Sequence, residues 1–393
     1  MEDELKEDRG LKEIPASEIL AKIEKGEPVE YDHVKIVGDL DISKLDLPKR
    51  HIDRTDLEIN SFGLEDEIAI INSIIKITCS DVLGVCNFGE AAFEKEVDFS
   101  GSHFHEYVDF CGSQFIRTDG DFSGSMFIED ANFSASQFNG WADFKGSRFI
   151  KRADFQLSVI LGGVDFSESE FNGAVDFLKC QFGFDVDFSG SKFKGTVTFN
   201  GSEFCRDACF SRCEFSQKTD FSWSQFDGDS LSFKHSKFCD PISQERACRS
   251  AKNVLERNGD RQEAGYYFYC EMDAKRKQKP CYIRYPEFFF LQLIFGYGVH
   301  PPRLIAWWGI IVAAFAAFYW IGSGLNGATQ LFDYLKFSLA TAIAPGYIAT
   351  IISPGSTGYM LDPKYQAVAI VESIFGTFLW AGFIATFAKK YMR

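Results

Sequence analysis

Phenylalanine recurs along residues 88–238 with a regularity that neither a helix nor a flat strand would produce. Successive positions alternate between five and six residues apart, except for two steps of seven and the replacement of one phenylalanine by Ile160, so the pattern repeats every eleven residues. The residue two positions before each phenylalanine is usually small, and the one directly before it is often aspartate. Because neighbours in an extended chain point to opposite sides, this predicts short faces with a small residue and a phenylalanine inside. A corner would follow each face.

Such faces can close into a spiral in which backbone groups pair between successive coils. With a coil spacing of about 4.8 Å and four faces per coil, the repeat would form about seven coils and a rod roughly 34 Å long. The phenylalanine rings would stack along its axis, with the small residues beside them. We therefore expect these rings to form a core without an obvious pocket.

The best-preserved runs read VDFSGSHF, GDFSGSMF, ADFKGSRF and VDFSGSKF. They resemble the phenylalanine-rich form of the pentapeptide-repeat family. The resemblance implies a right-handed quadrilateral β-helix over residues 88–240. It does not imply a function, because unrelated functions share folds.

The flanking segments have different patterns. Residues 1–30 are expected to form a disordered segment and a short capping helix at Ser17–Lys25. The β-branched residues of segment 31–87 predict strands that start and cap the β-helix. Apolar residues at helical spacing in segment 241–282 predict a cytosolic helical linker.

The last part of the chain is strongly apolar. Residues 283–303 are expected to lie at the membrane interface as a helix, and 304–393 to form a membrane domain. Leu304–Gly322 and Tyr365–Ala388 are each long and apolar enough to span a bilayer. Between them, the apolar part of Leu331–Ala349 is too short to cross a bilayer, and this segment contains the helix-breaking run Pro345-Gly346-Tyr347 near its end. This order predicts a re-entrant loop between two spans, because irregular backbone is tolerated at membrane depth only inside protein or along a water-filled path.

The runs FDYLKFSLAT, GY and FGTFLWAGFIATFAKK occur in this region in that order. They resemble the two-transmembrane pore-loop potassium-channel family. The resemblance implies a homotetramer, permeant monovalent cations, and a pore-lining helix that includes Glu372 and a candidate hinge at Gly376. The implied pore-loop and filter residues are Thr341, Ala342, Ile343, Ala344, Pro345, Gly346, Tyr347, Ile348 and Ala349.

The filter departs from the family pattern, which reads Thr-Val-Gly-Tyr-Gly-Asp. Gly346 and Tyr347 are retained, whereas the threonine, the second glycine and the aspartate are missing. Ile348 disfavours the left-handed backbone that a glycine permits, and Pro345 has a fixed φ and no amide donor. The sequence therefore predicts a potassium-like pore with a degenerate filter. Potassium selectivity, weaker cation selectivity and altered gating are all open alternatives.

Glu372 lies inside the second predicted span, where ionisable residues are functional candidates. One interpretation gives it a role in conduction, and Glu372→Gln should then alter conductance. In the other it is part of the scaffold, holding the loop by hydrogen bonds or lying near the outer interface.

Charge and composition limit the classes of binding partner that we expect. The net charge of −15 argues against nucleic acid, since phosphate binding needs clustered basic residues. Basic residues outside the spans predict a two-span plasma-membrane protein in contact with lipid, with both termini in the cytoplasm. The phenylalanine register puts Cys213 inside the coil and Cys209 outside it, so Cys205, Cys209 and Cys213 could not share a metal ion. We expect no metal, no cofactor and no enzymatic activity.

Two classes of function remain. The first is an oligomeric ion channel whose β-helix serves as a cytosolic assembly or sensing domain. The second is a non-conducting, membrane-anchored interaction or scaffold protein that uses the acidic β-helix as a binding surface.

Overall fold

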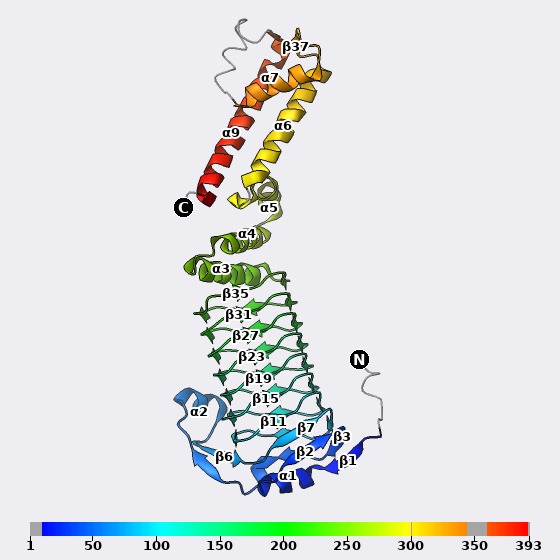
Figure 1. Cartoon of the computed structure of the whole chain (residues 1–393), viewed down its shortest axis with the longest axis vertical. Helices are drawn as coiled ribbons and strands as arrows, with labels where there is room; N and C mark the ends of the chain where they lie inside the picture. Colours follow the sequence, from blue (N-terminus) through cyan, green and yellow to red (C-terminus); the bar gives the residue numbers. More distant parts are fainter. Residues whose placement is uncertain (1–9, 300, 344–359, 392–393) are drawn as a thin grey trace. The chain divides into compact units, whose positions relative to one another are not determined.

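The computed structural model describes residues 10–299, 301–343 and 360–391 and divides the chain into two compact units. The first comprises Met1–Ala274 and the second Lys275–Arg393. The first is a β-solenoid of about ten turns with helices at both ends (Figure 1). The second contains two long apolar helices.

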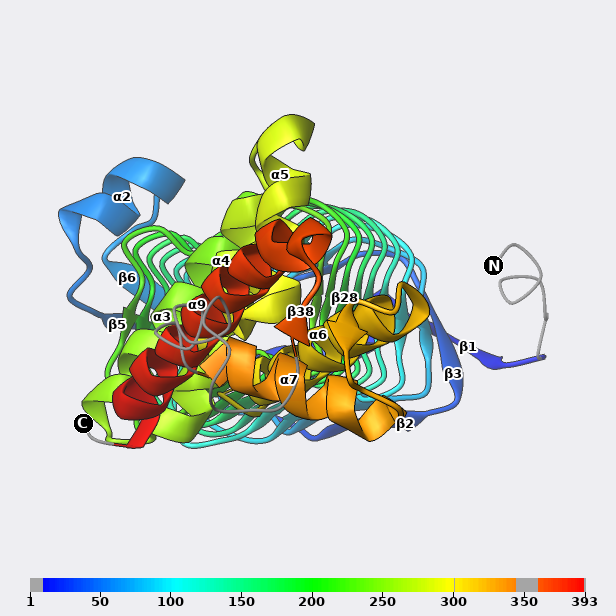
Figure 2. The same ribbon diagram turned by 90° about the horizontal axis from the view of Figure 1, so that it is seen from above.

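Four parallel sheets form the walls of the solenoid, as the view along the stacked coils in Figure 2 shows. Sheet A contains β1 (Lys12–Pro15), β3 (Val34–Val37), β8 (Asp81–Val82), β12 (His103–Phe104), β16 (Met126–Phe127), β20 (Arg148–Phe149), β24 (Glu170–Phe171), β28 (Lys192–Phe193), β32 (Glu214–Phe215) and β36 (Lys237–Phe238). Sheet B contains β2 (Val29–Asp32), β7 (Ile75–Thr78), β11 (Val97–Asp98), β15 (Gly120–Asp121), β19 (Ala142–Asp143), β23 (Val164–Asp165), β27 (Val186–Asp187), β31 (Ala208–Cys209) and β35 (Leu231–Ser232).

The other two sheets follow the same order along the solenoid. Sheet C contains β4 (Leu40–Asp41), β9 (Cys86–Asn87), β13 (Val108–Asp109), β17 (Ala131–Asn132), β21 (Ala153–Asp154), β25 (Val175–Asp176), β29 (Val197–Thr198) and β33 (Thr219–Asp220). Sheet D contains β5 (Lys49–His51), β6 (Glu67–Ile71), β10 (Ala91–Phe93), β14 (Gln114–Phe115), β18 (Gln137–Phe138), β22 (Val159–Ile160), β26 (Gln181–Phe182), β30 (Glu203–Phe204) and β34 (Gln225–Phe226). Within sheet D, β5 is antiparallel to β6.

The phenylalanine rings fill the axis of the solenoid, as the sequence pattern predicts. Phe166, for example, is fully buried and stacks between Phe144 and Phe188, with ring centroids 4.8 and 4.9 Å away. The sheets extend beyond the phenylalanine repeat because the segment before it adds coils lined by isoleucine, valine and leucine. The solenoid is therefore longer than the seven coils expected from the repeat alone.

The N-terminal segment departs from the prediction in two places. β1 begins at Lys12, inside the stretch expected to be disordered, and is followed by α1 (Ala16–Glu24). Segment 31–87, for which strands are predicted, also contains the short η1 (Ile42–Lys44) and the helix α2 (Asp56–Phe62). Thr55 and Glu58 form a reciprocal capping box at the start of α2, a signature that could have predicted this helix.

Two helices close the other end of the solenoid, α3 (Pro241–Arg257) and α4 (Arg261–Lys277). The buried Tyr267 hydroxyl accepts a hydrogen bond from the backbone amide of Phe233 at 2.7 Å. No further coil follows to accept a hydrogen bond from this amide, and the Tyr267 hydroxyl takes that role.

A column of carboxylates follows sheet B. Asp143 lies in register with Asp121 and Asp165 on the neighbouring strands. Its side chain also accepts a hydrogen bond from the Lys145 amide at 2.8 Å. Burial raises the pKa of Asp143, and the charges of Asp121 and Asp165 raise it further.

This column leads to a prediction. Asp143→Asn keeps an oxygen acceptor for Lys145 and removes like-charge repulsion, so it should stabilise the solenoid at pH 7 by about 0.5 kcal/mol. Because the folded wild type binds a proton more tightly than the unfolded chain, its stability rises as the pH falls. The advantage of asparagine should therefore shrink as the pH drops through the raised pKa towards the usual aspartate value of about 3.9. Urea denaturation at several pH values measures this.

Sheet C provides the reciprocal control. Asn132 lies in register between Asp109 and Asp154 and has its own oxygen bonded to the amide of Ser134. Asn132→Asp should destabilise the solenoid at pH 7 by a similar amount, with the loss disappearing in acid. An Asp143→Asn effect that does not change with pH would contradict the charge explanation.

The second unit begins with α5 (Cys281–Glu287), the π-helical η2 (Phe288–Ile294) and the 3₁₀ turn η3 (Gly296–Gly298). Two long helices follow, α6 (Pro301–Ile321) and α9 (Gln366–Tyr391). The segments Pro302–Ile321 and Pro363–Ala388 are long and apolar enough to cross a membrane.

A short helix, α7 (Leu331–Ile343), packs against both α6 and α9 (Figure 1). The antiparallel strands β37 (Leu325–Asn326) and β38 (Met360–Leu361) join the two connections at one end of these helices. The 3₁₀ turn η4 (Pro363–Tyr365) then leads into α9.

Candidate functional site

A polar cluster lies among the three apolar helices of the second unit, centred on Glu372 of α9. The Glu372 carboxyl group is completely buried. One of its oxygens lies 2.9 Å from the Tyr319 hydroxyl of α6, and the other is hydrogen-bonded to the Ser338 hydroxyl of α7. The Ser338 hydroxyl also lies 2.8 Å from the backbone carbonyl of Val312 in α6. The cluster therefore links all three helices.

Counting hydrogens in this cluster favours a protonated Glu372. The three contacts, Tyr319–Glu372, Ser338–Glu372 and Ser338–Val312, each need one hydrogen. The two hydroxyls supply one each, and the carbonyl supplies none. A protonated Glu372 supplies the third by donating to the Ser338 oxygen, while Ser338 donates to Val312. Neutral Glu372 thus satisfies every contact and avoids placing an isolated charge among apolar helices.

Aromatic packing holds the Tyr319 side of the cluster in place. The Tyr319 ring meets the Phe337 ring of α7 edge-on, with centroids 5.4 Å apart. Tyr365 also packs against Tyr319, with ring centroids 6.1 Å apart, and its hydroxyl donates to the Gly322 carbonyl at 3.0 Å. A Cβ atom on Gly322 would lie only 1.9 Å from the Tyr365 hydroxyl, so this contact requires glycine.

Gly376 lies one turn beyond Glu372 in α9. There, α9 is in close contact with Ala342 near the end of α7. A Cβ atom there would lie 2.5 Å from the Ala342 carbonyl oxygen and 2.7 Å from its Cα atom. Ala342 is fully buried in this contact. Gly376 lies inside the continuous helix α9, so its role as a hinge stays a prediction, and the geometry adds a packing role.

The structure describes only the first three residues of the predicted pore loop. Thr341 is buried, and its hydroxyl donates to the Phe337 carbonyl at 2.9 Å, whereas Ile343 is exposed. The predicted filter residues Ala344, Pro345, Gly346, Tyr347, Ile348 and Ala349 lie outside the described residues. The ion specificity inferred from them stays a prediction.

Sequence reasoning identified Glu372 but not its partners. Neither Tyr319 nor Ser338 is singled out by the sequence pattern. A hydroxyl in an apolar membrane segment is itself a signal, because it must find a hydrogen-bond partner there. The spacing along the chain could not identify the partner, since Tyr319 and Glu372 are 53 residues apart.

The cysteines at 205, 209 and 213 behave as the phenylalanine register predicts. Cys213 is buried and Cys209 is partly exposed, on opposite sides of the solenoid wall. They do not form a metal-binding group among the residues that the structure describes.

Comparison with protein families identifies repeats within the solenoid. A family described as pentapeptide repeats (9 copies) matches residues 157–203. The solenoid consists of pentapeptide repeats. The matched segment lies entirely within the stacked two-residue strands, so family and geometry agree on this part of the chain. No curated protein and no solved structure matches the chain.

The pentapeptide-repeat solenoid therefore accompanies two helices that could cross a membrane. The family match does not extend to α5–α9. Evidence for the function of the second unit therefore comes from its own geometry.

Proposed function

We propose that the second unit forms a pore for monovalent cations in an assembly of four copies, with the pentapeptide-repeat solenoid as a cytosolic assembly or sensing domain. The two long helices would lie in the plasma membrane, with both termini in the cytoplasm. One copy contributes a single loop, and a ring of coordinating groups requires several.

The observation that carries this proposal is the buried link from α7 to both span-length helices. At 13 residues, α7 is only about 20 Å long and cannot span the hydrocarbon core. Its Ser338 is nevertheless joined to α9 through Glu372 and to α6 through Val312. A short helix joined to both span-length helices supports a re-entrant arrangement of α7 between two spans.

The outer faces of the long helices support a lipid environment. Large apolar side chains of α6 and α9 are exposed in the single chain, and exposed apolar area of this extent is rare on soluble monomers. They include Ile310, Phe318, Trp320, Ile374 and Phe378. Lipid and neighbouring copies would cover these side chains.

Cation flux into liposomes containing the purified protein tests the proposal. The wild type should conduct potassium or sodium. Gly376→Val should reduce flux at least about tenfold, because overpacking against Ala342 costs about 1–3 kcal/mol and would displace the end of α7. Gly309→Val is the matched control, since a Cβ atom at Gly309 meets nothing within 4 Å.

An interaction or scaffold function is the second candidate. The carboxylate column of sheet B favours it, because aligned charges offer a regular acidic surface. A folded, oligomeric wild type that conducts no monovalent cation at any pH or membrane tension would reject the pore and favour this alternative. Equal flux in Gly376→Val and Gly309→Val would instead contradict the role given to α7.

A further inference from the structure

One corner of the solenoid carries a histidine and a cysteine on successive coils. β2 and β7 pair in parallel with Asp32 opposite Thr78, so His33 and Cys79 follow at equivalent positions. Both have left-handed backbone, with φ of 54° and 48°. Their side chains therefore leave the wall at the same corner, one coil spacing of about 4.8 Å apart.

The next coil leaves room for the thiol. Gly101 occupies the same corner there, and a Cβ atom on it would lie 3.1 Å from the Cys79 sulfur. In the later coils that the structure describes, the residues at this same corner do not include another histidine next to a cysteine. These residues are Gly101, Gly124, Gly146, Glu168, Gly190, Arg212 and His235.

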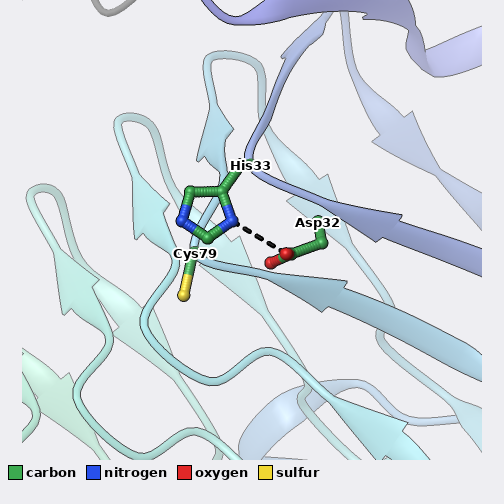
Figure 3. A group of neighbouring side chains, drawn as sticks. All are labelled: Asp32, His33 and Cys79. Atoms are coloured by element: carbon green, nitrogen blue, oxygen red, sulfur yellow. Dashed lines mark ion pairs between the residues drawn. The ribbon is translucent and has the colours of Figure 1, made fainter.

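Asp32 adds a carboxylate to this pair (Figure 3). One of its oxygens accepts a hydrogen bond from the Thr78 hydroxyl at 2.7 Å, and the other lies 2.8 Å from Nδ1 of His33. An exposed aspartate is a carboxylate at neutral pH. The orientation of Asp32 is thus set by contacts from two coils.

The three side chains supply the donor atoms that zinc prefers, which are thiolate sulfur, imidazole nitrogen and carboxylate oxygen. One such atom from each residue lies within 4.8 Å of the others. Tetrahedral zinc holds ligand atoms about 3.3–3.8 Å apart. All three side chains are exposed, so small rotations about their side-chain bonds can close the remaining distance.

We propose that Asp32, His33 and Cys79 bind a divalent transition-metal ion of the zinc type. The thiol loses its proton to solvent as the sulfur–metal bond forms, and the imidazole binds as a neutral base. Three protein ligands leave one position for water. The acidic chain, with a net charge of −15, favours the approach of cations.

The bound ion would have a structural role. β2 is the terminal strand of sheet B and has only β7 as its neighbour in that sheet. Terminal strands of a stacked repeat lack the second neighbour that stabilises internal ones. An ion shared by His33 and Cys79 would fasten this edge to the next coil and raise the stability of the folded chain by mass action. This inference is independent of the proposed pore.

Cobalt(II) titration of the purified full-length protein under reducing conditions tests the site. A thiolate-to-cobalt charge-transfer absorption should appear, and zinc should abolish it by displacement. Cys79→Ser should eliminate the absorption, and Asp32→Asn should weaken cobalt binding about tenfold. All these residues are exposed, so the substitutions leave the core intact.

Two control variants separate this site from other ligands on the surface. Cys239 is another exposed cysteine, and His235 occupies the same corner in the last coil. Cys239→Ser and His235→Ala should both retain the absorption. Absence of the absorption in the wild type, its persistence in Cys79→Ser, or its equal loss in Cys239→Ser would overturn the proposal.

Discussion

Glu372→Ala is expected to detach α7 from the two long helices and to abolish cation flux. The substitution leaves the buried Tyr319 hydroxyl without its acceptor and creates a cavity beside Ser338. An unsatisfied buried hydroxyl and a lost side chain together cost about 2–4 kcal/mol. Thermal unfolding of the detergent-solubilised protein and flux in liposomes should both register this loss.

Glu372→Gln is the discriminating variant, because the hydrogen count predicts that it behaves like the wild type. The glutamine oxygen can accept from Tyr319, and its amide can donate to Ser338, which still donates to Val312. All three contacts of the neutral acid are thereby retained. We expect stability within about 1 kcal/mol of the wild type and normal flux.

The two interpretations of Glu372 give opposite results in this experiment. If Glu372 acts in conduction through its charge, glutamine should alter conductance as strongly as alanine does. If it is part of the scaffold, only alanine should do so. Tyr319→Phe removes one contact while keeping the ring against Phe337, so its effect should be smaller than that of alanine at Glu372 and not additive with it.

Phe166→Ala is expected to have the largest effect on the stability of the solenoid, about 3–5 kcal/mol. The ring loses its stacked neighbours Phe144 and Phe188 and its edge contacts with Phe155 and Phe177, at 5.4 and 5.5 Å. The surrounding rings are held by strands on every side and cannot collapse into the cavity. Urea denaturation of the full chain, followed by the circular dichroism of its β-structure, measures the loss.

Two further variants should destabilise the solenoid less than Phe166→Ala does. Phe166→Ile should cost less than alanine, because Ile160 already fills an equivalent inward position between Phe138 and Phe182. Trp223→Ala removes an aromatic side chain that is 85% exposed and should change stability by less than about 0.5 kcal/mol. Similar losses in Phe166→Ala and Trp223→Ala would contradict the view that the ring stack stabilises the solenoid.

Local patterns predicted much of the fold. The alternation of small, polar and aromatic residues predicted which side chains face inward, including Cys213, because each short strand has only two sides. Continuous apolar stretches likewise predicted the two long helices. Helix α2 was not predicted, although the capping box formed by Thr55 and Glu58 is a local signal for the start of a helix.

Contacts between distant segments could not be read from these patterns. Hydrophobic period specifies which side of an element faces inward, but not which residue of another element it meets there. Ser338 and Glu372 are 34 residues apart, and Gly376 meets Ala342 because two helices cross at that point. His33 and Cys79 come together only through the register of β2 on β7, although strands β3–β6 and helix α2 lie between them in the chain. The chain itself therefore specifies a stacked solenoid and two apolar helices, whereas tertiary packing determines where a buried carboxyl group, a close helix contact and the three side chains of the proposed metal site are assembled.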